Sequence, residues 1–194
     1  MTRQLNKVKS METTIAYQKV IGWFFAYPLK EMSLNDLSAA LNMPKTTAKK
    51  VVEQLIKEGF LNRELFGKMW KISCNQNHIY NHTRKISQNL NMIFESQILD
   101  ILHDKIRNPK SVILFGSYRK GDDNEKSDID IAVEVLGNEE MKIAELGVIP
   151  QFGFRKNVLV NLHIFSRNKI DLNLFSNISN GILLEGFLEV KPWK

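Results

Sequence analysis

The sequence predicts a mixed α+β chain, with helices concentrated in its first half and a sheet in its last part. From residue 13 to residue 59, apolar residues recur at helical spacing. After residue 108 the pattern changes to short apolar runs and to strict alternation, which is typical of strands. At 194 residues and 43% hydrophobic content, the chain is long enough to form two small cores.

Two helices are predicted first. In residues 13–27 the apolar side chains fall on one helical face, and Pro28 ends the pattern. The second helix covers residues 33–42, where Ser33 is the expected N-cap and Asp36 occupies the capping-box position.

A third helix and a hairpin follow. Residues 45–59 form the helix, which Gly59 closes, and residues 60–73 form two apolar-rich arms around a turn at 66–68. This order of elements resembles a winged helix-turn-helix domain, of the kind found in many small prokaryotic transcription regulators. The sequence assigns it to residues 10–75.

The resemblance implies that the third helix and the hairpin contact DNA through base edges and phosphates. The candidate DNA-binding residues are Lys45, Thr46, Thr47, Lys49, Lys50 and Lys68. A net charge of +6 and a pI near 9.3 favour a polyanionic partner without selecting one. The alternative is a winged helix used for protein docking or dimerisation.

A long linker helix is expected at residues 76–108, because apolar residues are spaced for one buried face between residues 77 and 107. A helix of this length could also pair with a second copy, and helix-turn-helix proteins commonly bind two half-sites as dimers, so a homodimer is expected. The last domain is assigned to residues 109–194. Within it, a helix is predicted near residues 139–146.

The most informative segment begins with an apolar run at residues 111–115, which reads as a buried strand. Gly116 follows it directly, and a glycine lets the backbone approach a ligand closely. Ser117 adds a hydroxyl beside main-chain N–H groups at an expected helix start. The pair forms a candidate seat for phosphate.

The second half of this segment alternates with period two over residues 128–135, so Asp128 and Asp130 share one face of a strand. Their Cα atoms would be roughly 6–7 Å apart. Like charges at this distance repel each other unless a cation lies between them, and carboxylate oxygens suit magnesium.

Gly-Ser, ten residues and then Asp-x-Asp is the signature of the DNA polymerase beta superfamily of nucleotidyltransferases, and residues 111–194 resemble its minimal nucleotidyltransferase branch. The resemblance implies a mixed sheet with flanking helices. It also implies that Gly116 and Ser117 hold a nucleoside triphosphate, with ATP the expected nucleotide. Asp128 and Asp130 would bind Mg²⁺ or Mn²⁺. Arg119 and Lys120 could reach the triphosphate as fixed positive charges.

The family uses a third acid on a neighbouring strand, and here that position is Asn161, flanked by Val160 and Leu162. An amide oxygen can ligate magnesium, but it carries no charge and cannot act as a base near neutral pH. His163, two residues on, faces the same side and could be a base or a ligand for a softer metal. The other acidic candidates are Glu134 and Asp171, whereas Asp122 and Asp123 are expected to be solvated loop residues.

The sequence leaves two functions open. In the first, the chain is an enzyme with catalytic residues Asp128, Asp130 and Asn161 that transfers a nucleoside monophosphate to a hydroxyl acceptor. Some minimal nucleotidyltransferases act as antitoxins that adenylylate a partner toxin, so a protein acceptor is possible. In the second, the chain is a DNA-binding regulator whose nucleotidyltransferase domain senses nucleotides or is degenerate. No signal peptide or spanning segment is visible in the sequence, so a cytoplasmic protein without a membrane partner is expected.

Overall fold

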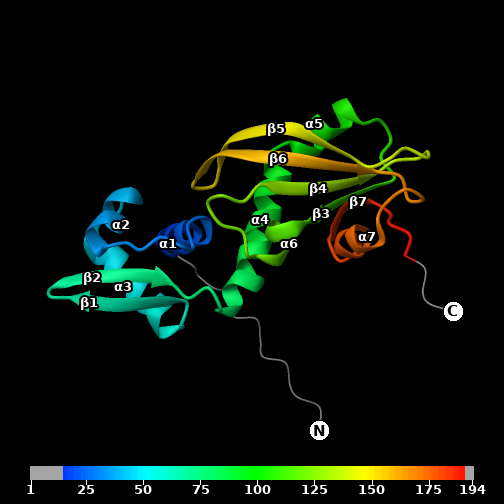
Figure 1. Cartoon of the computed structure of the whole chain (residues 1–194). Helices are drawn as coiled ribbons and strands as arrows, with labels where there is room; N and C mark the ends of the chain where they lie inside the picture. The colour runs from blue at the N-terminus through cyan, green and yellow to red at the C-terminus, as the bar shows by residue number, and fades with distance from the viewer. Residues whose placement is uncertain (1–14, 191–194) are drawn as a thin grey trace, which may run out of the picture.

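The computed structural model describes residues 15–190 and begins with three helices and a hairpin. The helices are α1 (Ile15–Ala26), α2 (Leu34–Ala40) and α3 (Lys45–Lys57), and the hairpin strands are β1 (Leu61–Phe66) and β2 (Met69–Cys74). Together they form a separate lobe beside the larger sheet (Figure 1). We call this lobe, from α1 to β2, the head. The expected helix start at residue 13 and the expected domain limits at residues 10 and 194 lie outside the described residues.

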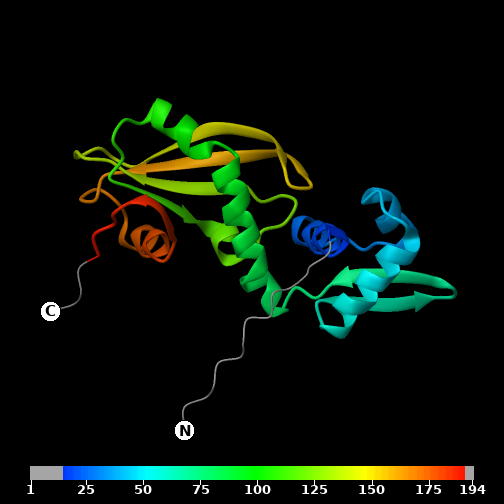
Figure 2. The same ribbon diagram turned by 180° about the vertical axis from the view of Figure 1, so that it is seen from behind.

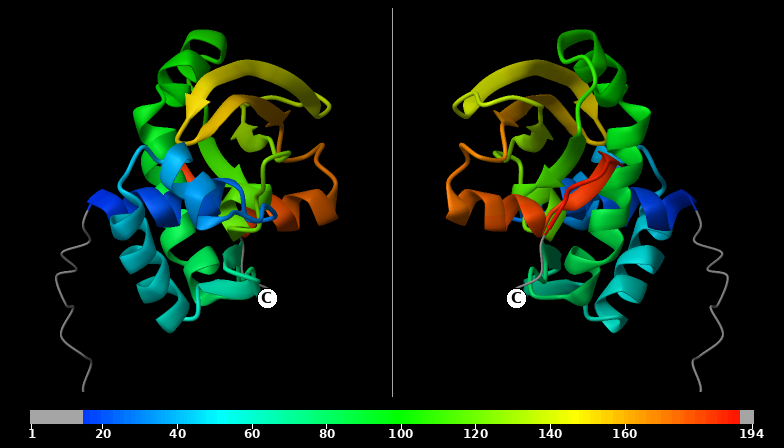
Figure 3. Two further views of the ribbon diagram at one scale, coloured as in Figure 1. Left: turned by 90° about the vertical axis from the view of Figure 1, so that its left-hand side faces the viewer. Right: turned by 90° about the vertical axis from the view of Figure 1, so that its right-hand side faces the viewer.

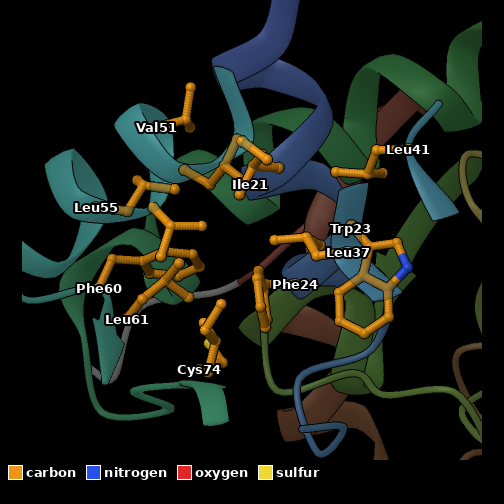
Figure 4. Packing of buried hydrophobic residues seen from close by; sticks show 14 of the residues in the cluster. Ile21, Trp23, Phe24, Leu37, Leu41, Val51, Leu55, Phe60, Leu61 and Cys74 are labelled. Carbon is orange, nitrogen blue, oxygen red and sulfur yellow. The ribbon is translucent and has the colours of Figure 1, made fainter. Parts of the chain in front are cut away.

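The helix ends predicted in the head are present in the structure. Ser33 Oγ accepts a hydrogen bond from the Asp36 backbone N–H at 3.2 Å and donates one to Asp36 Oδ2 at 2.7 Å. Gly59 has a φ of +84° just after α3, the left-handed conformation that favours glycine at a helix end. Apolar side chains from all three helices and from the hairpin then close over one core, including Ile21, Phe24 and Leu55 (Figure 4).

The segment between the head and the sheet is not one helix, so the expected linker helix is wrong in detail. It consists of the 3-10 turn η1 (Ile79–His82), α4 (Arg84–Glu95) and α5 (Ile98–Lys105). The break lies at Gln97, which has a φ of +59°. Ser96 donates its hydroxyl to the Ile93 carbonyl at 2.7 Å, which satisfies an acceptor at the end of α4. The change of direction at the break lets both helices pack on the sheet.

The sheet has five strands in the order β5-β6-β4-β3-β7. The strands are β3 (Ser111–Phe115), β4 (Ile129–Glu134), β5 (Lys142–Phe152), β6 (Arg155–Phe165) and β7 (Ile182–Gly186). β4 and β6 are parallel, and the other neighbours are antiparallel. The chain therefore combines helices, a small hairpin and a five-stranded mixed sheet.

Helices cover both faces of the sheet. α4 and α5 lie on one face, as the view from behind shows (Figure 2), and α7 (Leu172–Ser179) lies on the other (Figure 3). Successive side chains of β4 point to opposite faces of the sheet and so belong to two different cores. Ile131 and Val133 face α4 and α5, and Ala132 faces α7. Residues of β4 with even numbers, which include Asp130, therefore lie on the α7 face.

The helix predicted near residues 139–146 is wrong, because these residues lead into β5 and belong to it from Lys142 onward. The segment contains Ala144, Glu145 and Leu146, which favour helices in isolation. Pairing with β6 extends along nearly the whole strand, from Lys142 opposite Ile164 to Phe152 opposite Arg155. This long-range pairing overrides the local preference.

Glu134 ends β4 as a buried carboxylate, with 2% of its surface exposed. Arg167 binds it through two nitrogens, at 2.9 Å to Oε1 and 3.2 Å to Oε2, and Lys110 Nζ lies 3.3 Å from Oε1. Burial raises the pKa of Glu134, but the hydrogen bonds and charges of Arg167 and Lys110 outweigh it and hold the pKa below its usual value. Both of its oxygens are thus occupied at the far end of the strand from Asp130, which argues against Glu134 as the third acid.

We expect this pairing to contribute to stability at neutral pH and to be lost in acid. A carboxylate with a lowered folded pKa stabilises the fold above its unfolded pKa, about 4.3, and loses that contribution as the pH falls through the folded value. Glu134→Gln should reduce the unfolding free energy at pH 7 by about 1–3 kcal/mol. Chemical denaturation from pH 7 to pH 3 should show a shallower pH dependence in the variant. Parallel curves for the two proteins would contradict this.

Within residues 15–190, no helix is long and apolar enough to cross a bilayer.

Candidate active site

The Gly-Ser turn and the Asp-x-Asp strand meet at one end of the α7 face. β3 ends at Phe115, and the short helix α6 (Gly116–Lys120) begins directly after it. Gly116 has a φ of +72°, and a Cβ atom at this position would lie 2.9 Å from Asp130 Oδ2. The site therefore needs glycine both for its backbone conformation and for the close approach of the carboxylate.

Both carboxylates of the motif remain accessible. Asp128 directly precedes β4 and is exposed, and the side chain of Asp130 is 29% exposed. Asp130 lies opposite Phe115 across the antiparallel β3–β4 ladder. A ligand seated at Gly116 would therefore lie next to the Asp130 carboxylate.

The parallel strand β6 places the two sequence candidates Asn161 and His163 beside Asp130. Asn161 is the register partner of Asp130, so the two side chains lie on the same face. His163 Nε2 lies 3.2 Å from Asp130 Oδ1, and its ring packs edge-on against Phe115, with centroids 4.8 Å apart at 85°. His163 Nδ1 is buried and has no hydrogen-bond partner among residues 15–190. The remaining acidic candidate, Asp171, caps α7 by accepting hydrogen bonds from the N–H groups of Asn173 and Leu174, both at 3.0 Å.

Arg119 and Lys120 open onto a pocket of about 220 Å³ between α6 and α7, which we call the α6–α7 pocket. The other lining residues are Phe115, Gly116, Leu174, Asn177 and Asn180. No carboxylate lines it, and neither cation forms an ion pair within the part of the chain that the structure describes. Two adjacent cations without a counter-charge favour an anionic ligand. The side-chain amides of Asn177, in α7, and of Asn180, directly after it, were not anticipated from the sequence.

The loop between the two halves of the motif contains a buried ion pair, so the expectation of a solvated Asp123 is wrong. Asp123 is 3% exposed, and its Oδ1 lies 3.3 Å from the Nζ of Lys85, which is 2% exposed. Asn89 donates to the same oxygen at 2.9 Å, and Lys85 also donates to the Asp123 carbonyl. Burial raises the pKa of Asp123 and lowers the pKa of Lys85, and each partner opposes the shift of the other.

A second cation fixes the end of the same loop. Arg155, at the start of β6, donates to the Ser127 carbonyl at 2.6 Å, to the Glu125 carbonyl at 3.3 Å and to the Tyr118 hydroxyl. Asp128 follows Ser127 directly, so Arg155 and Lys85 together fix the loop that positions the first carboxylate of the motif. One sequence signal could have revealed Lys85 and Asn89: both occupy the buried face of α4, four residues apart, where Ile93 continues the stripe.

The oxygen atoms of Asp128, Asp130 and Asn161 are suitable ligands for one divalent cation that arrives with a substrate. No group of three His, Cys, Asp or Glu side chains in residues 15–190 is arranged to hold a metal on its own. Magnesium typically takes one or two protein carboxylates and completes its shell with water and substrate phosphates. Asp128 and Asp130 can supply such carboxylates, and Asn161 can add an amide oxygen. The missing Cβ at Gly116 leaves room for Asp130 Oδ2 beside the backbone.

In the head, three of the candidate DNA-binding residues line one pocket of about 230 Å³. These are Lys45 and Lys49 of α3 and Lys68 of the hairpin turn, and Ser33 and Trp70 also border the pocket. Thr46 and Lys50 are exposed and Thr47 is half-buried, but none of these three lines it. Lys49 also lies 3.9 Å from Glu53 on the helix surface.

Residues 95–182 match the family model described as "Nucleotidyltransferase domain". The matched range includes the Gly-Ser turn, the Asp-x-Asp strand and Asn161, and it begins upstream of α5. The chain therefore contains a nucleotidyltransferase domain, whose class of reaction is the transfer of a nucleoside monophosphate from a nucleoside triphosphate. No curated protein matches the chain at a significant level.

Proposed function

We propose that this protein is a metal-dependent nucleotidyltransferase that transfers a nucleoside monophosphate, with ATP the expected donor, to a hydroxyl acceptor. The observation that carries the proposal is the contact between the two halves of the motif. Gly116 lies so close to Asp130 that a single added carbon would meet its carboxylate oxygen at 2.9 Å. A phosphate held at the Gly-Ser turn would therefore be presented to the carboxylates at the start of β4.

The α6–α7 pocket supports the same assignment for the rest of the triphosphate. Arg119 and Lys120 can neutralise the terminal phosphates, and Asn177 and Asn180 can donate amide hydrogens to phosphate oxygens. At the other end of the site, Asp128 and Asp130 carry negative charge. Without a cation, Asp128 and Asp130 would repel the triphosphate, so the two ends of the site are suited to different parts of a metal-bound nucleotide.

In the proposed reaction, the oxygen of the acceptor hydroxyl forms a bond to the α phosphorus, and the bond between that phosphorus and the bridging oxygen to the β phosphate breaks. Pyrophosphate leaves with the bonding electrons, next to Arg119 and Lys120. The hydroxyl proton goes to a carboxylate of the Asp128/Asp130 pair, because the amide of Asn161 cannot accept it near neutral pH. A bound divalent cation supplies charge stabilisation at the phosphoryl oxygens.

The acceptor in this proposal is a protein side chain. The test is to incubate the purified chain with α-labelled or γ-labelled ATP and Mg²⁺ or Mn²⁺, alone and with cell extract. Label from the α position should become attached to a protein of the extract, and label from the γ position should appear as pyrophosphate. Transfer of γ label to protein would indicate kinase chemistry. Absence of transfer with either label and either metal would reject the enzyme function.

A second candidate function follows from Asn161 and from the head. We propose, as the alternative, a DNA-binding regulator in which the head is a winged helix-turn-helix domain and the nucleotide site is a sensor. Asn161 in place of an acid favours binding without turnover, and the pocket with Lys45, Lys49 and Lys68 offers cations to DNA phosphates. In this alternative the protein binds two half-sites as a homodimer.

Gel shifts with the wild type and with Lys49→Ala/Lys50→Ala would test this alternative, with light scattering to measure the oligomeric state. Binding should weaken as salt rises, and the double variant should bind less tightly and with a smaller salt slope. Lys142→Ala, which removes an exposed lysine far from the head, provides the control. Equal affinity of all three proteins would remove the support for a recognition helix at α3.

A further inference from the structure

The imidazole of His163 occupies an unusual place for a histidine of this chain. The other three histidines face carbonyls or a carboxylate away from the Gly116–Asp130 contact: His78 faces the Glu58 carbonyl, His82 the Lys120 carbonyl and His103 the Glu185 carboxylate. His163 faces Asp130, a carboxylate of the nucleotide site. Its side chain is 14% exposed, so a ligand at the site can reach it.

The separation of the two side chains is informative. Two neighbouring ligands of an octahedral ion, each about 2.1 Å from the metal, lie about 3 Å apart. His163 Nε2 and Asp130 Oδ1 are 3.2 Å apart, close to that edge length. A direct hydrogen bond would have a similar length. Both atoms could therefore bind one ion without a rearrangement of the strands.

The surroundings orient the ring with Nε2 toward the carboxylate. Phe115 packs edge-on against the imidazole, and Nδ1 is buried with no hydrogen-bond partner among residues 15–190. Nε2 is thus the ring atom directed at the site. Asn161, the register partner of Asp130, adds a neutral oxygen donor from the same strand as His163. The donors that β4 and β6 present here are the carboxylate of Asp130, the amide of Asn161 and the imidazole of His163, where a site made only of acids would present oxygen alone.

We propose that His163 is a ligand of the nucleotide-bearing metal, beside Asp130, and that this nitrogen makes the site select Mn²⁺ or Co²⁺ over Mg²⁺. This inference rests on the proposed function for the arrival of the metal with a nucleotide. Magnesium prefers oxygen ligands, whereas imidazole binds transition metals, with affinity rising from Mn²⁺ to Co²⁺. His163 would take up the coordination that Asn161, as an uncharged amide, supports only weakly.

Electron paramagnetic resonance tests the proposal without requiring turnover. The full chain is loaded with Mn²⁺ and an ATP analogue whose bridge between the α and β phosphates is a methylene group. Electron spin-echo spectra of the wild type should show coupling of Mn²⁺ to a ¹⁴N nucleus. His163→Asn should lose that coupling and bind Mn²⁺ about 10–100-fold less tightly, as even outer-shell changes at metal sites do. Its affinity for Mg²⁺ should change less.

The control is His103→Gln, which removes an exposed histidine on α5 and should leave the nitrogen coupling intact. Thermal unfolding of each variant separates loss of metal from loss of fold. Coupling that is absent in the wild type, or that persists in His163→Asn, would overturn the proposal, and so would a wild type that does not bind Mn²⁺ with the analogue.

The proposed function and this inference can fail separately. Transfer of α label in Mg²⁺ without nitrogen coupling would reject only the role of His163. Nitrogen coupling without any transfer would retain His163 as a ligand and reject catalysis.

Discussion

Asp130→Asn is expected to reduce nucleotide transfer by about 10³-fold or more, with little change in fold. The substitution keeps the shape of the side chain beside Gly116 but removes the negative charge that would bind the metal of a nucleotide seated there. Interactions between a metal and the reacting phosphoryl group contribute several kcal/mol, and each 1.36 kcal/mol corresponds to a factor of ten in rate. The measurement is the initial rate of α-label transfer at saturating ATP and metal.

Asp104→Asn provides a matched control for this experiment. Asp104 is an exposed carboxylate on α5, outside the Gly116–Asp130 contact, and the change removes the same charge from the chain. Its transfer rate should equal that of the wild type. A rate for Asp130→Asn within about tenfold of the wild type would show that the reaction, if present, occurs elsewhere in the protein.

Lys85→Met is expected to cause the largest loss of stability, about 3–5 kcal/mol, because it leaves Asp123 buried without its counter-charge. Asn89 still donates one hydrogen bond to Asp123, but its uncharged amide cannot neutralise the carboxylate. The reciprocal change, Asp123→Asn, should be costly for the same reason, since Lys85 is 2% exposed. Urea denaturation at pH 7 gives both free energies.

The double variant Lys85→Met/Asp123→Asn distinguishes lost charge pairing from lost packing. With both members of the pair replaced by uncharged side chains, it should be more stable than the sum of the two single losses predicts. Lys142→Met removes a lysine from an exposed pair with Glu139 and should leave the denaturation curve unchanged. A double variant whose loss equals the sum of the single losses would mean that the two side chains do not act as a pair.

The sequence predicts the parts of this fold that depend on neighbours along the chain. The Ser33 cap, the end of α3 at Gly59 and the strand before Gly116 are all present where the residues indicate them. The same holds for the alternation that places Asp130 on one face of β4, because a period of two is a property of a strand alone. Each of these features is determined by a few consecutive residues.

The errors concern contacts between distant segments. The helix predicted near residues 139–146 failed because pairing with β6 decides the conformation of β5. The break at Gln97 depends on how α4 and α5 pack on the sheet, and no glycine or proline marks it. Asp123 was misjudged because its partner, Lys85, lies 38 residues earlier in the chain. For Asn161 and His163, the residue types were visible, but their position beside Asp130 required the parallel register of β4 and β6.

A seat for a metal-bound nucleotide at Gly116, Asp128 and Asp130 underlies every function proposed for this protein. Isothermal titration of the full chain with the methylene analogue of ATP tests it, with Mn²⁺, with Mg²⁺ and with excess chelator. Binding should require a divalent cation and should be lost in Asp128→Asn/Asp130→Asn, while Asp104→Asn binds as the wild type does. Equal affinity in the presence of chelator, or an undiminished affinity in the double variant, would contradict the central claim.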